Sequence, residues 1–206
     1  MSVEFELVTR LSEADIERAT YVLSKVFKND PLFLYLFPFD ATRSHLMNAF
    51  FRANLEYCLE VGEVYTSYGI SGCAMWLFPG CRAGLCQGHT DTRASQFQTV
   101  LDNESLNRLL AFMQHMRGCH NQVIKQPHCL LLFLGVDEEH RSHGIGTRLL
   151  QPVLKMADSK KLPCLLDTMN RDNLVFYEKQ GFKVCLEGQI CRYGPMAWTM
   201  VRWPEI

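Results

Sequence analysis

The feature that most constrains the fold is a strand that runs into a glycine-rich turn and then into a helix. Residues 129–136 are continuously apolar, which predicts a strand buried on both faces. Gly144 and Gly146 follow a short polar loop and open a helix over residues 144–158. The apolar positions of that helix have helical spacing: Leu149, Leu150, Val153, Leu154 and Ala157. The first amides of such a helix are unpaired and its dipole is positive there, so the turn predicts an anion site.

The turn lacks residues that two common classes of phosphate-binding motif require. A dinucleotide fingerprint would need glycine where Leu149 stands, and a P-loop would need lysine after Gly146, where Thr147 stands. Both NAD and ATP are therefore disfavoured. A glycine-rich helix entry without a ligand stays open as an alternative, because the acidic loop 137–139 would repel an anion unless it points away.

The remaining periodicities predict an α/β fold with a mixed sheet. We expect strands at 3–8, 64–68, 73–78, 163–168, 182–186 and 193–202, and helices at 12–27, 43–59, 106–116 and 173–180. The strands at 64–68 and 73–78 form a hairpin, and residues 80–95 are expected to be a loop. Asn29-Asp30-Pro31 is interpreted as the stop of the first helix.

Composition excludes several classes of function. The 206 residues include 21 Lys+Arg and 22 Asp+Glu, a net charge of −1, so no basic surface for nucleic acid is expected. No apolar run approaches the ~20 residues of a membrane span. The first residues lack the basic and apolar regions of an export signal, and the nine cysteines are scattered, so a reducing, cytoplasmic location is expected.

Metal binding is not expected either. His115, Cys119, His120, His128 and Cys129 lie in one stretch, but none of them forms the close Cys-x-x-Cys pair of a zinc site.

A second informative segment follows the strand at 163–168. Asn173 and Tyr177 are four residues apart and share a helix face, and Gly181 suits the left-handed position that ends the helix. The alternative for Tyr177 is a core residue with a satisfied hydroxyl.

These segments resemble the GNAT N-acetyltransferase superfamily. Arg141-x-x-Gly144-x-Gly146 is similar to its acetyl-CoA signature, and Asn173-x-x-x-Tyr177 followed by Gly181-Phe182 is similar to its second conserved segment. Within the superfamily the chain looks like the puromycin N-acetyltransferase-like branch. The residues that carry this likeness are 134–136, 144–146, 162–168 and 173–182, with 27–31 and 74–79 upstream.

The resemblance implies one N-acetyltransferase domain over residues 1–206, built on a mixed sheet splayed at the cofactor site with helices on both faces. Residues 1–127 would hold the acceptor-lining helices, 128–187 the acetyl-CoA core and 188–206 a last strand. The residues implied to bind acetyl-CoA are Leu134, Gly135, Val136, Arg141, Ser142, His143, Gly144, Ile145, Gly146, Thr147, Asn173 and Tyr177.

The implied reaction is direct attack of a primary amine on acetyl-CoA in a ternary complex. Tyr177 would face the sulfur and the Val136 amide the oxyanion. An ordinary phenol is a weaker acid than a thiol by roughly 2 kcal/mol, so Tyr177 is expected to stabilise the thiolate mainly by hydrogen bonding. The strand 129–136 has no carboxylate, so Asp167 is the first candidate for the base. His128, a water chain, or a purely structural Asp167 are the alternatives.

The acceptor side is assigned to Asp30, Tyr35 and Trp76. Aromatic residues at 33, 35, 37 and 39 would form an apolar wall, with Asp30 recognising the amine charge; core packing is the alternative. A small-molecule amine is the expected partner of a monomer or homodimer. A protein or peptide amine, or a non-catalytic module that binds coenzyme A, stay open.

Overall fold

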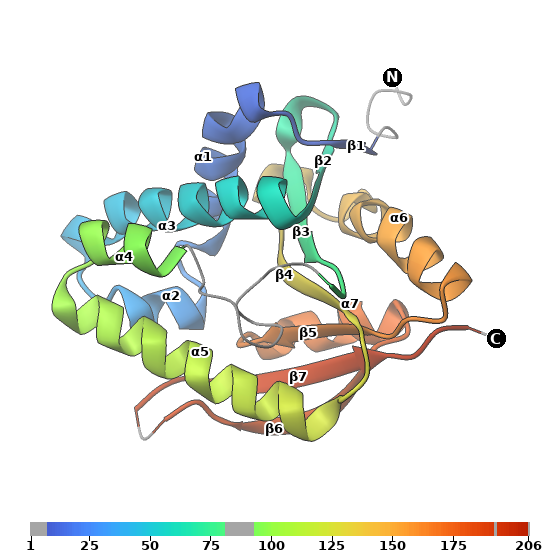
Figure 1. Cartoon of the computed structure of the whole chain (residues 1–206). Coiled ribbons are helices and arrows are strands. Elements are labelled where there is room, and N and C mark those ends of the chain that lie inside the picture. The colour runs from blue at the N-terminus through green and yellow to red at the C-terminus, as the bar shows by residue number, and fades with distance from the viewer. Residues whose placement is uncertain (1–7, 81–92, 192, 206) are drawn as a thin grey trace.

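The fold is built on one mixed sheet. The computed structural model describes residues 8–80, 93–191 and 193–205, so most of the strand expected at 3–8 and of the loop expected at 80–95 lies outside the described residues. The strand order is β1-β2-β3-β4-β5-β7-β6 (Figure 1). The strands are β1 (Val8–Arg10), β2 (Gly62–Ser67), β3 (Gly72–Leu77), β4 (Cys129–Val136), β5 (Cys164–Thr168), β6 (Lys183–Gln189) and β7 (Met196–Arg202). Only β4 and β5 pair in parallel, which confirms the α/β class.

Helices cover both faces of the sheet. They are α1 (Ile16–Phe27), α2 (Pro31–Leu36), α3 (Asp40–Val61), α4 (Arg93–Val100), α5 (Asn103–Val123), α6 (Ile145–Ser159) and α7 (Leu174–Lys179). Because side chains alternate along a strand, β3 serves two cores. Met75 packs with the core of α1–α3, whereas Trp76 packs with the core under α6.

The sheet opens between β4 and β5, as expected. The two strands pair from Cys129↔Cys164 to Leu131↔Leu166. Beyond that point β4 stays beside β3 as far as Val136, while Asp167 of β5 pairs with Thr199 of β7. The strands therefore separate after Leu131 and Leu166, and the far half of β4 has a free edge toward β5.

Most predicted elements are confirmed within a few residues. The helix α2 at residues 31–36 was not among them. The Asp30 carboxylate accepts the Leu32 amide at 2.9 Å, and Pro31 occupies the first turn of α2. Asp30 is therefore the N-cap of α2, three residues after the end of α1, and Pro31 suits a first helical turn because it needs no amide partner there. The predicted stop is confirmed, because α1 ends at Phe27, but the helix that starts directly after it was not predicted.

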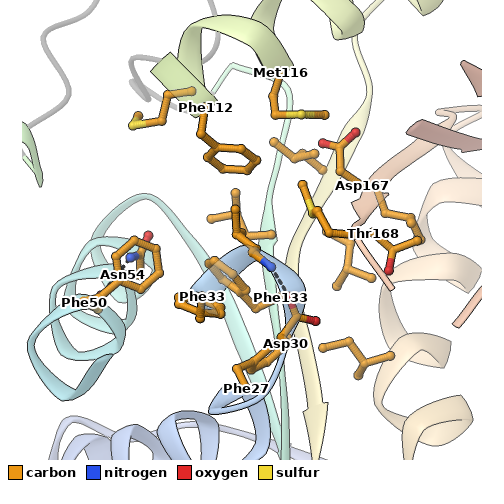
Figure 2. A pocket seen from close by; sticks show the side chains of 18 of the residues that line it. Phe27, Asp30, Phe33, Phe50, Asn54, Phe112, Met116, Phe133, Asp167 and Thr168 are labelled. Atoms are coloured by element: carbon orange, nitrogen blue, oxygen red, sulfur yellow. Dashed lines mark hydrogen bonds between the residues drawn. The ribbon is translucent and has the colours of Figure 1, made fainter. Parts of the chain in front are cut away.

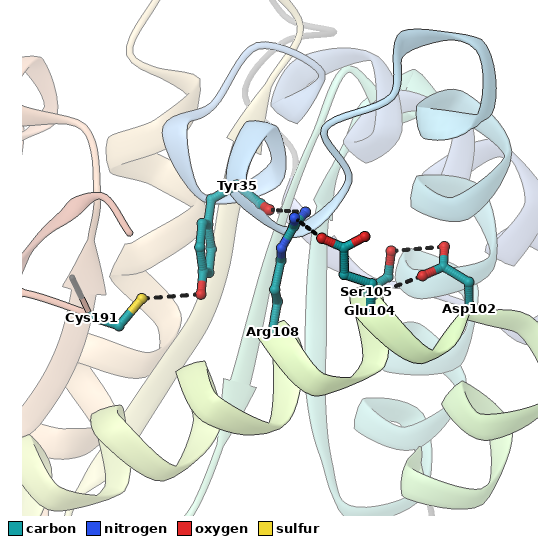
Figure 3. A network of polar contacts seen from close by, with 6 residues as sticks. All are labelled: Tyr35, Asp102, Glu104, Ser105, Arg108 and Cys191. Atoms are coloured by element: carbon teal, nitrogen blue, oxygen red, sulfur yellow. Dashed lines mark hydrogen bonds and ion pairs between the residues drawn. The ribbon is translucent and has the colours of Figure 1, made fainter. Parts of the chain in front are cut away.

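A polar network fastens α2 to α5 (Figure 3). Arg108 of α5 donates to the Tyr35 carbonyl at 3.1 Å and lies over the Tyr35 ring, 5.7 Å from its centre. The Tyr35 hydroxyl lies 3.1 Å from the sulfur of Cys191, which follows β6. Burial raises the pKa of Tyr35 to about 12. The network holds together α2, α5 and the segment after β6, which are distant in sequence.

Within the described part of the chain, no helix is long and apolar enough to cross a bilayer.

Candidate active site

The turn before α6 leaves backbone donors open. Gly144 has φ 74° and precedes the helix without any side-chain cap, and the first helical bond runs from the Arg148 amide to the Gly144 carbonyl. The amides of residues 145–147 therefore have no acceptor inside the helix. Unpaired amides and the positive end of a helix dipole are the features that suit an anion.

Gly146 sets how closely α6 approaches α7. A Cβ at this position would lie 3.2 Å from the Phe176 ring, tighter than an ordinary contact. Gln180 also donates to the Thr147 hydroxyl at 3.3 Å. This packing brings the face of α7 that carries Tyr177 beside the turn.

A lysine from another element offsets part of the negative charge of the acidic loop. Lys25 of α1 lies 3.0 Å from both carboxylate oxygens of Asp137 and 3.8 Å from Glu139. The repulsion considered from the sequence is therefore offset by a cation from another element.

An open cleft runs along the turn and the free edge of β4. It is lined by eleven of the twelve residues expected to bind acetyl-CoA: Leu134, Gly135, Val136, Arg141, Ser142, Gly144, Ile145, Gly146, Thr147, Asn173 and Tyr177. His143 is not on the cleft wall, because its ring bonds the Arg141 carbonyl at 2.7 Å. Arg141 itself donates to the Val136 carbonyl at 3.1 Å, so that carbonyl already has one partner.

A second cavity, of about 120 Å³, lies on the α1–α3 side of β4 and is mainly apolar (Figure 2). Its wall includes Phe27, Phe33, Phe50 and Phe133, and the Phe33 and Phe50 ring centres are 5.3 Å apart. Figure 2 shows Asp30 and Asp167 well separated along this cavity. An apolar chamber with carboxylates at separate places can hold an organic cation by both its body and its charge.

Asp30 is a carboxylate that burial leaves poorly solvated. Burial raises its pKa above the ordinary range, although the bond from Leu32 opposes that effect. Among the described residues it has no ion-pair partner. A cation arriving in the cavity would supply one.

Asp167 is held by two side chains. Its Oδ2 lies 2.6 Å from Nε2 of His120 on α5, and its Oδ1 accepts the Thr199 hydroxyl at 2.7 Å. His120 and Asp167 both line the apolar cavity, and each side chain is 14% exposed. No local pattern predicts this pair, because its members are 47 residues apart and lie on different elements.

The cleft and the cavity meet at residues that line both. These are Phe27, Asp30, Leu134, Asn173 and Tyr177. Tyr177 is 7% exposed, and within the described part of the chain its hydroxyl has no hydrogen-bond partner. Burial first, and the nearby Asp30 charge second, hold the pKa of Tyr177 above its ordinary value. The phenol is therefore protonated at neutral pH and free to donate to a bound group.

Three residues expected at the site do not line either space. Trp76 is fully buried under α6, because strand alternation directs it to the face opposite the cavity. The side chain of Tyr35 contacts Arg108 and Cys191 and does not face the cavity. His128, the second candidate base, bonds the Gln126 carbonyl at 2.9 Å instead. No group of three metal-ligating side chains occurs among residues 8–80, 93–191 and 193–205.

Comparison with known proteins agrees with this geometry. Residues 98–184 match the acetyltransferase (GNAT) domain family. An uncharacterized N-acetyltransferase of Schizosaccharomyces pombe is 23% identical over 187 residues, 84% of this chain and 72% of the relative. A histone acetyltransferase HPA2 and related acetyltransferase from Corynebacterium glutamicum superposes with a TM-score of 0.70 at 21% identity, covering 97% of this chain and 96% of that one. Arylalkylamine N-acetyltransferase 2 from Aedes aegypti superposes with a TM-score of 0.61 at 14% identity, over 97% and 99%.

Residues 98–184 thus match the GNAT acetyltransferase domain family, and the chain shares its fold with these structures. The family match and the similarity to the yeast protein make it an N-acetyltransferase.

Proposed function

We propose that this enzyme transfers the acetyl group of acetyl-CoA to the primary amine of a small molecule, by direct attack in a ternary complex. The observation that carries the proposal is the junction of the cleft and the aromatic cavity at Asp30, Asn173 and Tyr177. A donor in the cleft and an acceptor in the cavity would meet there without a covalent enzyme intermediate.

The residues of the cleft fit coenzyme A. The open amides of residues 145–147 suit a diphosphate, and Gly144 leaves the approach to them clear. The free edge of β4 at Leu134 and Val136 can bond the pantetheine arm as a further strand would. When bound, acetyl-CoA supplies the thioester that the amine attacks.

Tyr177 is proposed to donate a hydrogen bond to the sulfur. Full proton transfer from an ordinary phenol to a thiolate is already uphill by roughly 2 kcal/mol. Because the pKa of Tyr177 lies above the ordinary value, transfer is more uphill still. Hydrogen bonding without transfer is therefore the role that the surroundings of this residue support, and the Val136 amide is retained as the donor to the oxyanion.

The acceptor is proposed to be a cationic amine with an apolar or aromatic body. Asp30 offers a carboxylate without a counter-ion, and the phenylalanines offer apolar walls. The mosquito structure of similar fold is named for arylalkylamines, which belong to this chemical class. The deprotonation step is placed near Asp167, which lines the cavity beside the point where β4 and β5 separate. The sequence likeness alone supports the puromycin N-acetyltransferase-like branch.

A thiol-release assay tests the proposal. Purified protein and acetyl-CoA are incubated with 2-phenylethylamine, with the neutral 2-phenylethanol, with putrescine and with a lysine peptide, and the products are weighed by mass spectrometry. We expect release and a gain of one acetyl group with 2-phenylethylamine. Release with the peptide alone, or binding of acetyl-CoA without release for any amine, would refute the small-amine function.

A further inference from the structure

His120 is the only imidazole that lines the aromatic cavity among the described residues. It lies in the last turn of α5, where the helix dipole favours a positive charge. The cavity around it is apolar, so a proton acceptor at this place has little competition from bulk water. These features suit a group that gains a positive charge when it takes up a proton.

The contacts of Asp167 favour His120 over Asp167 as the proton acceptor. Each oxygen of Asp167 already has a partner, His120 at 2.6 Å and Thr199 at 2.7 Å. A carboxylate accepts hydrogen bonds, so the Nε2 atom of His120 carries the proton of that contact. The lone pair of the neutral ring then lies on Nδ1. The carboxylate thereby fixes the tautomer and the orientation of the ring.

We propose that His120 accepts the proton of the acceptor ammonium and that Asp167 is its positioning residue, an inference that rests on the proposed function. One ammonium N–H bond breaks and one Nδ1–H bond forms. The electron pair of the broken bond stays on the amine nitrogen, which becomes the nucleophile. The positive charge moves to the imidazole ring, where the Asp167 carboxylate balances it.

The other charged or titratable residues that line the same cavity are Asp30, Arg93 and Tyr177. Two further titratable residues lie close to the pair. Cys119 precedes His120 on α5, and burial first and the Asp167 charge second raise the pKa of its thiol. His128, before β4, has its pKa lowered mainly by burial and slightly by His120. Neither residue lines the cavity. His128 is the neighbouring imidazole, so the test includes its variant.

The test compares His120→Gln with the wild type in the thiol-release assay across pH. Glutamine can still donate to Asp167 but cannot take up a proton near neutral pH. We expect kcat/KM to fall by roughly 10²- to 10⁴-fold and the acid limb of the profile to disappear. Titration calorimetry with coenzyme A should give an unchanged Kd, and thermal unfolding should show a folded variant. His115→Gln, the same substitution on the same helix but away from the cavity, should behave as the wild type.

Two further variants separate catalysis from structure. Asp167→Asn should lower kcat/KM less than His120→Gln while keeping an acid limb, because the imidazole remains. His128→Gln should retain the acid limb of the profile. Loss of the acid limb in His128→Gln, with retention in His120→Gln, would overturn the assignment. Wild-type kinetics of folded His120→Gln would overturn only the role of His120. A wild-type protein that binds coenzyme A but acetylates no amine would refute the proposed function and, with it, this role.

Discussion

Removing the Tyr177 hydroxyl isolates one step of the proposed reaction. The Tyr177→Phe ring still fills the same buried place, and the deleted hydroxyl has no partner among the described residues. Unfolding free energy should therefore change by less than about 1 kcal/mol, since no hydrogen bond is lost. A hydrogen bond to a charged thiolate contributes about 1.5–3 kcal/mol, so kcat should fall roughly 10- to 150-fold.

The assay measures thiol release at saturating amine over a range of acetyl-CoA concentrations. The KM for acetyl-CoA should stay within about twofold, because the hydrogen bond strengthens only as charge develops on sulfur. Tyr21→Phe is the matched control, since Tyr21 lies on the surface of α1 and is 65% exposed. An unchanged kcat for Tyr177→Phe, or a loss confined to KM, would remove Tyr177 from the chemical step.

Three other perturbations test the cleft, the acceptor charge and the C-terminal support. Gly146→Ala should raise the KM and Kd for acetyl-CoA several-fold, because the new Cβ would lie 3.2 Å from Phe176; unchanged calorimetric binding would refute this. Asp30→Asn should raise the KM of cationic amines at least roughly tenfold. Burial raises the pKa of Asp30, so the folded wild type loses stability as the pH rises through that pKa. The free energy of unfolding in urea should therefore be higher for Asp30→Asn than for the wild type at pH 8, but not at pH 4. Asp158→Asn should destabilise the protein by about 1–2 kcal/mol at pH 7, because Asp158 bonds Arg202 at 2.6 and 2.8 Å. Since the bond from Arg202 lowers the pKa of Asp158, this difference should fade only below about pH 4; a pH-independent difference would contradict it.

The cofactor side of the site could be predicted because it is local in sequence. The strand Cys129–Val136, the turn at Gly144 and the helix after it follow one another directly, and the structure keeps that order. Tyr177 and Asn173 share one face through the four-residue spacing of a helix. Local patterns were therefore enough to place the strand, the turn and the helices, and the resemblance carried by the same segments implied the eleven residues that line the cleft.

The acceptor side could not be predicted in the same way, because distant segments build it. Alternation along β3 predicts that Met75 and Trp76 point to opposite faces, but it does not say which face holds the cavity. Tyr35 lies in an aromatic run, and only the position of α5 shows that Arg108 engages it. His120 and Asp167 meet through the packing of α5 against the sheet, which leaves no trace in the local pattern.

The separation of β4 and β5 explains why the proposed base lies outside β4. The wall that β4 gives to the cavity, at Leu132, Phe133 and Leu134, is wholly apolar. The residue on β5 just past the last pair with β4 is Asp167, so a carboxylate first appears where the strands diverge. Directly paired to β7 through Thr199, Asp167 is fixed on the side away from β4 and can orient a ring from α5. In this proposal the apolar side chains of β4 determine which amine fits the cavity, and Asp167 of β5 orients the imidazole that accepts the proton. A substitution at Phe133 should therefore change which amine is accepted more than it changes the pH profile.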